Sequence, residues 1–184
     1  VKNMETKVDI RKRVLKKRNE LSEKEWEEKS AKIVEKLIAH PFFLESEEIY
    51  CYVDFRKEVC TKQIIETAWK LHKKVAVPKT ENDMKFYYIS SWEDVESGNW
   101  GILEPITKDY ADGEKVCVIM PGAVFDFKKN RIGYGKGYYD TYLQSRPEYK
   151  TIALAFELQM LDKIPSEAHD ICPQMIITEE YTYV

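Results

Sequence analysis

Apolar side chains in the first forty residues recur at the three- and four-residue spacing of helices. The first stripe predicts a helix from Val8 to about Arg18 and consists of Ile10, Val14 and Leu15. A second helix is expected after Ser22, because Ser22 and Glu25 have the spacing of a capping box, in which each side chain accepts a hydrogen bond from the other residue's backbone N–H. The stripe behind this cap consists of Trp26, Ile33, Val34, Leu37 and Ile38.

From residue 48 onward, runs of β-branched and aromatic residues alternate with helical patterns. The runs that predict strands are Glu48 to Val53, Lys74 to Pro78, Lys85 to Ile89, Val116 to Met120, Thr151 to Phe156 and, as the last strand, Gln174 to Thr178. Thr61 is expected to cap a helix that carries Ile64, Ile65, Ala68 and Leu71, and Tyr138 to Gln144 predicts another helix. Such alternation is typical of an α/β fold built around a mostly parallel sheet.

The composition narrows the classes of function. With 184 residues, 43% of them apolar, the chain is long enough for one domain with a substantial core. Its net charge of -3, with basic residues dispersed among acids, lacks the basic face of a nucleic-acid binder. No apolar run approaches about 18 residues, and the N-terminal segment lacks the apolar centre of a signal peptide. We therefore expect a cytoplasmic protein that binds neither nucleic acid nor membranes.

Two sets of residues are assigned to packing. The cysteines are far apart and have no metal-binding spacing, so we expect reduced, mostly packed thiols at Cys51, Cys60, Cys117 and Cys172. We also expect the aromatic residues of the predicted strands to pack within the sheet, namely Tyr50, Tyr52, Phe86, Tyr87 and Tyr88.

Three of the seven glycines crowd into the stretch NRIGYGKGYYD, from Asn130 to Asp140. Glycine inside an element costs roughly 0.5–1 kcal/mol relative to alanine, so the cluster indicates backbone geometry that a Cβ would forbid. The stretch follows a buried strand and precedes a helix, which is where ligands of open α/β sheets bind. Its backbone amides can approach an anion, and Arg131 and Lys136 supply positive charge. A polyphosphate fits this chemistry, and a plain turn before a helix is the alternative.

Two familiar nucleotide motifs are absent from this stretch. The P-loop requires Ser or Thr after Gly-Lys, whereas Gly137 follows Lys136, and Tyr138 stands where the dinucleotide fingerprint has its third glycine. Asp140 allows two interpretations: an acid favoured by the dipole of a helix N-terminus, or a ligand for Mg²⁺ beside phosphates.

The stretch MPGAVFDFKKNRIGYGKGYYD, from Met120 to Asp140, resembles the signature of the 5-formyltetrahydrofolate cyclo-ligase family. The similarity extends along the chain, through Lys7 and Arg11 (K-x-x-x-R), Val77-Pro78-Lys79, Trp100-Gly101-Ile102 with Glu104-Pro105, Ile164-Pro165 to Asp170, and Ile176-Ile177-Thr178-Glu179. Essentially the whole chain is covered.

The resemblance implies a three-layer α/β/α domain with a mostly parallel mixed sheet, occupying residues 1–184. It implies an ATP- and Mg²⁺-dependent conversion of 5-formyltetrahydrofolate to 5,10-methenyltetrahydrofolate, through an N5-iminium phosphate, with release of ADP and phosphate. Such chemistry depends on positioning and charge neutralisation, which agrees with the absence of a G-x-S-x-G nucleophile motif. We expect a monomer or a weak homodimer.

The resemblance also implies roles for particular residues. The ATP-binding residues would be Lys7, Arg11, Arg131, Ile132, Gly133, Tyr134, Gly135, Lys136, Gly137, Tyr138 and Tyr139, and among these Lys136 and Arg131 would act in catalysis. The folate would contact Val53, Glu58, Trp100 and Tyr138, and Mg²⁺ would bind Asp140 and Asp170. Lys79 would face either the glutamate of the folate or the phosphates.

Without the resemblance these residues have plainer interpretations. Lys7 and Arg11, four residues apart, form a solvated basic helix face, and Glu58 is an exposed acid at a helix start. Two other functions are alternatives to the cyclo-ligase activity. A non-catalytic nucleotide-binding module would require damage to the motif, and the motif is intact. A sugar-phosphate isomerase or acyl-CoA transferase on a similar fold would need a base or a glutamate nucleophile placed for carbon chemistry.

Overall fold

A computed structural model describes residues 5–184 of the chain. The helices are α1 (Lys7–Asn19), α2 (Glu23–Ile38), α3 (Pro41–Glu45), α4 (Lys62–Lys70) and α5 (Tyr138–Gln144), and the 3₁₀ turns are η1 (Trp92–Asp94), η2 (Asn99–Gly101) and η3 (Glu157–Gln159). The strands are β1 (Glu48–Cys51), β2 (Lys74–Thr80), β3 (Met84–Ile89), β4 (Val95–Ser97), β5 (Leu103–Pro105), β6 (Val116–Met120), β7 (Val124–Asp126), β8 (Arg131–Ile132), β9 (Lys150–Leu154), β10 (Met160–Leu161), β11 (Met175–Ile177) and β12 (Thr182–Tyr183).

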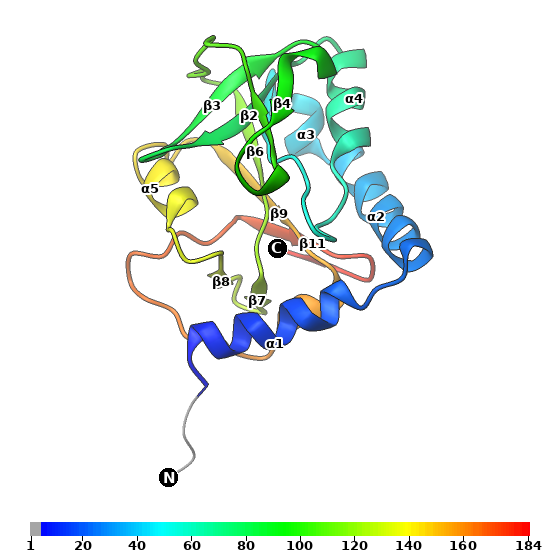
Figure 1. Cartoon of the computed structure of the whole chain (residues 1–184), viewed down its shortest axis with the longest axis vertical. Helices are drawn as coiled ribbons and strands as arrows, with labels where there is room; N and C mark the ends of the chain where they lie inside the picture. Colours follow the sequence, from blue (N-terminus) through cyan, green and yellow to red (C-terminus); the bar gives the residue numbers. More distant parts are fainter. Residues whose placement is uncertain (1–4) are drawn as a thin grey trace.

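A seven-stranded sheet in the order β12-β11-β9-β6-β1-β2-β3 runs through the molecule (Figure 1). The five inner strands are parallel to one another, whereas β3 and β12 pair antiparallel at the two edges. Both faces of an inner parallel strand are covered, which is why VCVIM of β6 is apolar throughout and fully buried. The predicted mostly parallel mixed sheet is confirmed.

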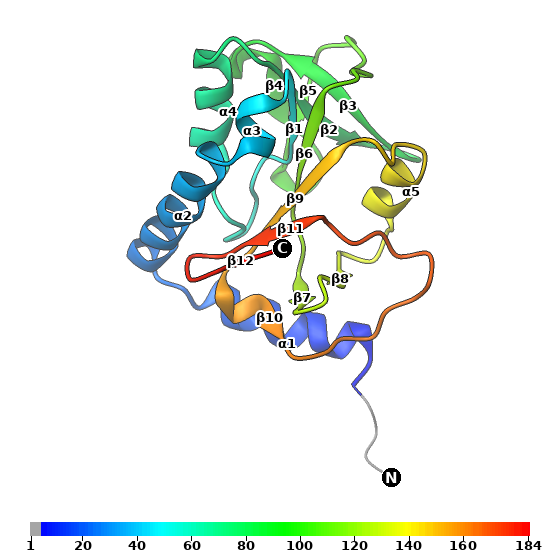
Figure 2. The ribbon, with the colours of Figure 1, turned by 180° about the vertical axis from the view of Figure 1, so that it is seen from behind.

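Helices cover both faces of this sheet (Figures 1 and 2). On one face α2, α3 and α4 pack through a core that includes Leu37, Phe43 and Ile65. On the other face α5 packs through Tyr142 and Leu143. The small sheet β10-β7-β8 lies against α1 through a third cluster, formed mainly by Ile10, Val14, Ala123, Val124, Ile132 and Ile164. The predicted three-layer α/β/α fold is confirmed.

The structure confirms the predicted N-terminal cap of α2 and contradicts the predicted cap of α4. Ser22 and Glu25 form the expected capping box of α2. Thr61 is the N-cap residue of α4, but its side chain makes no capping hydrogen bond, so this prediction is wrong. The backbone of Thr61 is already right-handed helical, whereas a capping side chain needs an extended residue. Its hydroxyl donates to Asp54 Oδ1 at 3.1 Å instead.

The segment between β6 and α5, where the sequence predicted no strand, contains the hairpin β7–β8. Asp126 holds the turn of this hairpin and is 1% exposed. Its Oδ1 accepts from the N–H groups of Lys128 and Asn130, each at 3.0 Å, and its Oδ2 accepts from Asn130 Nδ2 at 3.0 Å and Ile164 N–H at 3.2 Å. Part of the family signature therefore builds the scaffold that presents the glycine stretch.

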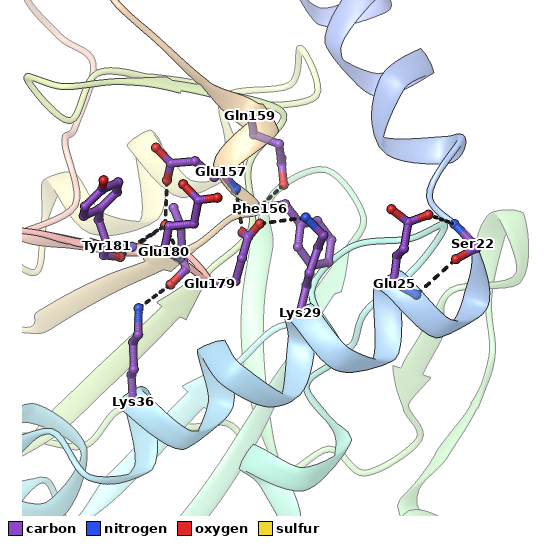
Figure 3. A network of polar contacts seen from close by, with 11 residues as sticks. Ser22, Glu25, Lys29, Lys36, Phe156, Glu157, Gln159, Glu179, Glu180 and Tyr181 are labelled. Carbon is purple, nitrogen blue, oxygen red and sulfur yellow. Dashed lines mark hydrogen bonds and ion pairs between the residues drawn. The ribbon is translucent and has the colours of Figure 1, made fainter.

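The C-terminal segment is tied to α2 by the polar network in Figure 3. Glu179 accepts from Lys29 Nζ at 3.2 Å and from Glu157 N–H at 2.7 Å, and Lys36 Nζ donates to Thr178 O at 2.8 Å. The strand predicted here is β11, but it is not the last one, since β12 follows it and pairs antiparallel. With two residues, β12 is too short to show an alternating pattern.

The residues assigned to packing divide between core and surface. All four cysteines are free thiols; Cys51 and Cys117 are buried, while Cys172 is exposed. Tyr50, Tyr52 and Phe86 lie in the core as expected, and Tyr52 also lines the cleft described below. Among residues 5–184, no helix combines the length and apolar character needed to cross a membrane.

Candidate active site

A cleft of about 1290 Å³ opens at the carboxyl ends of β1, β2 and β6. The chain leaves β1 for β2 on one side, and later returns to place β6 on the other side, so the cleft lies at the topological switch point of the sheet. Strand ends diverge there, and ligands of open α/β sheets bind in the resulting crevice.

With the exception of Lys79, the residues that the sequence assigned to a site line this cleft: Lys7, Arg11, Val53, Glu58, Trp100, the run from Arg131 to Asp140, and Asp170. They come from α1, from the segment after β1, from the turn between β4 and β5, from the glycine stretch and from the segment after β10. The structure thus brings together residues up to 163 positions apart, such as Lys7 and Asp170. Lys79 is not among the lining residues and pairs with Glu81.

The glycine stretch needs glycine for its backbone at two positions. Gly135 has φ +96° and Gly137 has φ +65°, conformations that residues with a Cβ rarely adopt. Gly137 is also the N-cap of α5, where no side chain caps the helix. Because α5 has only seven residues, its dipole is short, and most of the positive charge at this wall comes from side chains.

Two arginines frame the glycine stretch. Arg11 Nε donates to Gly133 O at 2.7 Å, and Arg131 Nε donates to Pro121 O at 2.7 Å while its guanidinium lies 5.1 Å from the centroid of the Tyr139 ring. Burial lowers the pKa of Arg131, and the nearby Tyr139 and Asp140 oppose that shift. An arginine stays protonated in proteins. Neither guanidinium pairs with a carboxylate among the described residues, so both can offer donors to an anion.

Lys136 lies at the exposed tip of the same stretch. Its ammonium forms no ion pair within the part of the chain that the structure describes. A lysine in this position is a mobile point charge that can follow a phosphate group without breaking an existing contact.

Carboxylates gather on the side of the cleft where α1 meets the segment after β10. Lys7 Nζ lies 3.3 Å from Asp170 Oδ2, and Ile171 N–H donates to Asp140 Oδ1 at 2.9 Å. That second bond joins α5 to the segment that carries Asp170. Burial raises the pKa of Asp170, but the Glu167 N–H, Lys7 and His169 outweigh it, so the pKa lies below its ordinary value.

The carboxylate side suits a hard divalent cation. One ligand atom each from Glu167, His169 and Asp170 lies within 4.8 Å of the others. The second oxygen of Asp140 accepts no hydrogen bond from residues 5–184. Mg²⁺ prefers a few carboxylate oxygens together with phosphates and water, so Asp140 and Asp170 fit it, and the imidazole of His169 fits it less well.

Glu58 lines the cleft from the segment after β1. Its Oε1 accepts from Phe55 N–H at 2.8 Å, and its Oε2 accepts from the hydroxyl of Tyr134 at 3.1 Å. Burial raises the pKa of Glu58 to about 7, against the lowering effect of Arg18, the Phe55 N–H and the Tyr134 hydroxyl. Arg56 and Lys57, which precede it, have φ +47° and +61°. A strained turn therefore presents a carboxylate with a perturbed pKa, which is frequent at functional sites.

Trp100 forms the outer lip of the cleft. It is 82% exposed and has φ +63°, within the turn between β4 and β5. The neighbouring Gly101 approaches the ring of Phe55, which would lie 3.8 Å from a Cβ at that position. A large exposed indole on a strained turn has little structural use, so its position favours contact with a ligand.

Sequence reasoning missed several lining residues, of which Arg18 is the most informative. Arg18 is 3% exposed. It follows Arg11 by seven positions, so it lies on the same face of α1 as Lys7 and Arg11. That spacing was visible in the sequence. The contributions of Tyr52, Pro121 and Glu167 had no local signal, because each depends on where its strand or segment ends in space.

A mostly parallel sheet whose switch point carries a cleft lined by a cationic glycine stretch and by carboxylates is typical of an α/β enzyme. The chain belongs to the 5-formyltetrahydrofolate cyclo-ligase family, whose model matches residues 3–179. It is 31% identical to the mouse 5-formyltetrahydrofolate cyclo-ligase over 176 residues, which cover 87% of each chain.

Solved structures agree with this assignment. The NMR structure of the 5,10-methenyltetrahydrofolate synthetase of Aquifex aeolicus superimposes with a TM-score of 0.85 at 32% identity, covering 96% of this chain and 91% of that one. The Mycoplasma pneumoniae synthetase, at 23% identity and a TM-score of 0.76, shares the fold over 94% of this chain and 98% of its own. The resemblance that the sequence indicated is confirmed.

Proposed function

We propose that residues 1–184 act as one catalytic domain that cyclises 5-formyltetrahydrofolate to 5,10-methenyltetrahydrofolate at the expense of ATP, with release of ADP and phosphate. The observation that carries the proposal is that one cleft is lined by both the cationic glycine stretch and Glu58. A family member needs a phosphate site and a pterin site within reach of each other, since a phosphoryl group must pass between the two ligands.

The nucleotide phosphates are assigned to the glycine stretch. Residues 133–137 line the cleft, and Lys7, Arg11, Arg131 and Lys136 line it with them. Donors aimed at the equatorial oxygens of the γ-phosphate lower the barrier to its transfer, because charge on those oxygens is neutralised in place. Lys136 is the residue free to move with the transferred group.

The folate is assigned to the wall formed by Glu58, Val53, Trp100 and Tyr138. A carboxylate accepts from the amino group and ring N–H of a pterin, which are neighbouring donors. The Phe55 N–H and the Tyr134 hydroxyl each donate a hydrogen bond to one oxygen of this carboxylate. The aromatic side chains offer apolar surface to the ring system.

The reaction balances as two displacements. The formyl oxygen forms a bond to the γ-phosphorus while the bond to the β-bridging oxygen breaks, giving ADP and an N5-iminium phosphate. N10 then attacks the iminium carbon, and loss of phosphate and of the N10 proton leaves the methenyl bridge. An amide oxygen is a weak nucleophile, so the enzyme contributes mainly alignment and charge neutralisation.

The carboxylates that would hold Mg²⁺ are Asp140 and Asp170. The ion would supply positive charge to the phosphates. Lys7, which pairs with Asp170 in this structure, can then turn to a phosphate oxygen. The cytoplasmic location and the monomeric or weakly dimeric state predicted from the sequence remain predictions.

The experiment that tests the function follows the near-ultraviolet absorbance of the methenyl product. Protein, Mg²⁺ and 5-formyltetrahydrofolate are mixed with and without ATP, and a rise that requires ATP is expected. If no rise occurs while the nucleotide still binds, a non-catalytic nucleotide-binding module becomes the better description.

A further inference from the structure

Arg18 is a buried cation whose charge is not matched by a carboxylate in direct contact. It is 3% exposed; its Nη1 donates to the hydroxyl of Tyr134 at 2.9 Å and its Nη2 donates to Arg56 O at 3.0 Å. Its buried Nε finds no partner among residues 5–184. Burying such a charge is costly unless the surrounding groups compensate for it. Here the Tyr134 hydroxyl, which contacts both Arg18 and Glu58, links the buried charge to a carboxylate.

The hydroxyl of Tyr134 connects Arg18 to Glu58. A guanidinium has no acceptor, so the phenol oxygen must accept from Arg18, and its single proton is left for Glu58 Oε2 at 3.1 Å. The direction of both hydrogen bonds is thereby set. Three groups from separate parts of the chain form one relay, in which the charge of the arginine polarises the phenol toward the carboxylate.

Tyr134 belongs to the stretch assigned to the nucleotide. It stands between Gly133, whose carbonyl accepts from Arg11, and Gly135, which has φ +96°. Tyr134 is 45% exposed, so little packing opposes a small shift of the stretch. Phosphates that bind the amides of this stretch restrict its backbone, and they restrict the Tyr134 hydroxyl with it.

We propose that Tyr134, supported by Arg18, couples the two ligands: nucleotide bound at the glycine stretch fixes the Glu58 carboxylate for the pterin, and so raises the affinity for folate. The inference rests on the proposed function and adds a regulation to that site. By thermodynamic linkage, folate must raise the affinity for nucleotide by the same factor.

The charged and titratable groups around Glu58 bear on the pH dependence of this coupling. Arg18 faces it from α1, Tyr134 from the glycine stretch, and Asp54 and Tyr52 from the segment after β1, while Arg131 and Tyr139 lie further away. The Tyr134 hydroxyl is one of the groups that lower the pKa of Glu58 from the value that burial alone would give. Removal of this hydroxyl therefore raises the pKa of Glu58 further.

The test measures the affinity for 5-formyltetrahydrofolate with and without the Mg²⁺ complex of a non-hydrolysable imido analogue of ATP. In the unaltered protein we expect the analogue to tighten folate binding by about 10-fold, within the usual range of coupling between sites. In Tyr134→Phe this factor is expected to fall to within about 2-fold of unity. The reciprocal measurement, analogue affinity with and without folate, must give the same factors.

A second readout and two further variants separate coupling from general damage. Folate affinity should rise with pH as Glu58 ionises, and the midpoint should move to higher pH in Tyr134→Phe. Tyr181→Phe, at an exposed tyrosine outside the cleft, should match the unaltered protein. Arg18→Lys keeps the charge but replaces the two donor nitrogens of the guanidinium with one ammonium, so it should weaken the coupling. If this variant does not fold, Tyr134→Phe, at a half-exposed position, still tests the inference.

Two results would overturn the inference while the proposed function stands: an unaltered coupling factor in Tyr134→Phe, or a factor of one in the unaltered protein despite normal ATP-dependent turnover. A loss of affinity for both ligands in Tyr134→Phe with the factor unchanged would show a merely structural role. Failure of the unaltered protein to bind either ligand would remove the proposed function, and the coupling with it.

Discussion

The ammonium of Lys7 lies 3.3 Å from the carboxylate of Asp170, across 163 positions of the chain. This pair joins the first helix to the segment after β10 at the edge of the cleft. It is partly exposed, so it adds little to stability. Under the proposed function, a bound phosphate would attract the lysine, and a divalent cation would attract the carboxylate.

Replacement of Lys7 by methionine should weaken nucleotide binding with little effect on folding. A hydrogen bond between charged groups is worth about 1.5–3 kcal/mol, so the KM for ATP is expected to rise roughly 10- to 100-fold. Steady-state kinetics at saturating folate measures this. Lys12→Met, an exposed lysine of the same helix that does not line the cleft, is the matched control. Equal KM values for the two variants would assign Lys7 to the solvated helix face.

Lys136→Ala should lower turnover by about 100-fold or more, because it removes a charge that would stabilise the transferred phosphoryl group. The side chain is exposed and supports no packing, so the unfolding temperature should stay within a degree or two of the unaltered value. Lys128→Ala, on the exposed turn of the β7–β8 hairpin, is the control for loss of a lysine. Near-normal turnover in Lys136→Ala would remove that residue from the mechanism.

Asp170→Asn should raise the Mg²⁺ concentration that gives half the maximal rate by about 10-fold or more, whether the carboxylate binds the ion directly or through water. The rate is measured against Mg²⁺ after treatment with a chelator. Asp162→Asn changes an exposed acid on the same segment, outside the cleft, and should leave the Mg²⁺ requirement unaltered. The same Mg²⁺ dependence in both variants would withdraw Asp170 as a ligand.

Asp126→Asn should destabilise the fold although the residue lies outside the cleft. The carboxylate accepts four hydrogen bonds, two at each oxygen, and an asparagine would turn its NH₂ group toward two donors. Leaving buried donors unsatisfied costs about 1–3 kcal/mol each, so a loss of roughly 2–4 kcal/mol is expected in denaturant unfolding. Lys128→Ala, which keeps its backbone donor, should unfold like the unaltered protein.

Glu58→Gln should change how stability depends on pH. The pKa of Glu58 is about 7 in the folded protein and its ordinary value is 4.5, so between these values the folded form holds a proton that the unfolded form has released. Stability from this group is therefore greatest below about pH 4.5 and falls as the pH rises toward 7. Glutamine does not titrate, so the variant should gain stability relative to the unaltered protein between pH 4 and pH 8. A difference in unfolding temperature that stays constant over that range, or an equal change in the exposed Glu27→Gln, would contradict this.

The sequence by itself determined most of the framework. The stripe of α2 and its capping box, the continuous apolar run of β6 and the helix from Tyr138 to Gln144 are local patterns, and the structure contains each of them. Helical periodicity and buried strand composition act over a few residues, so they can be read without knowing the fold. The glycine stretch was also a local signal, since residues such as Gly135 mark their own backbone requirement.

Only the tertiary structure decided which residues share the cleft and which build its support. Asp126 and Asn130 belong to the same signature as Lys136, yet they hold a hairpin turn. Glu58 acquires its raised pKa from burial, which no local pattern contains. Arg18 reaches it through Tyr134, 116 positions away. Contacts between distant segments depend on where strands end at the switch point, and that position is set by the packing of the whole sheet.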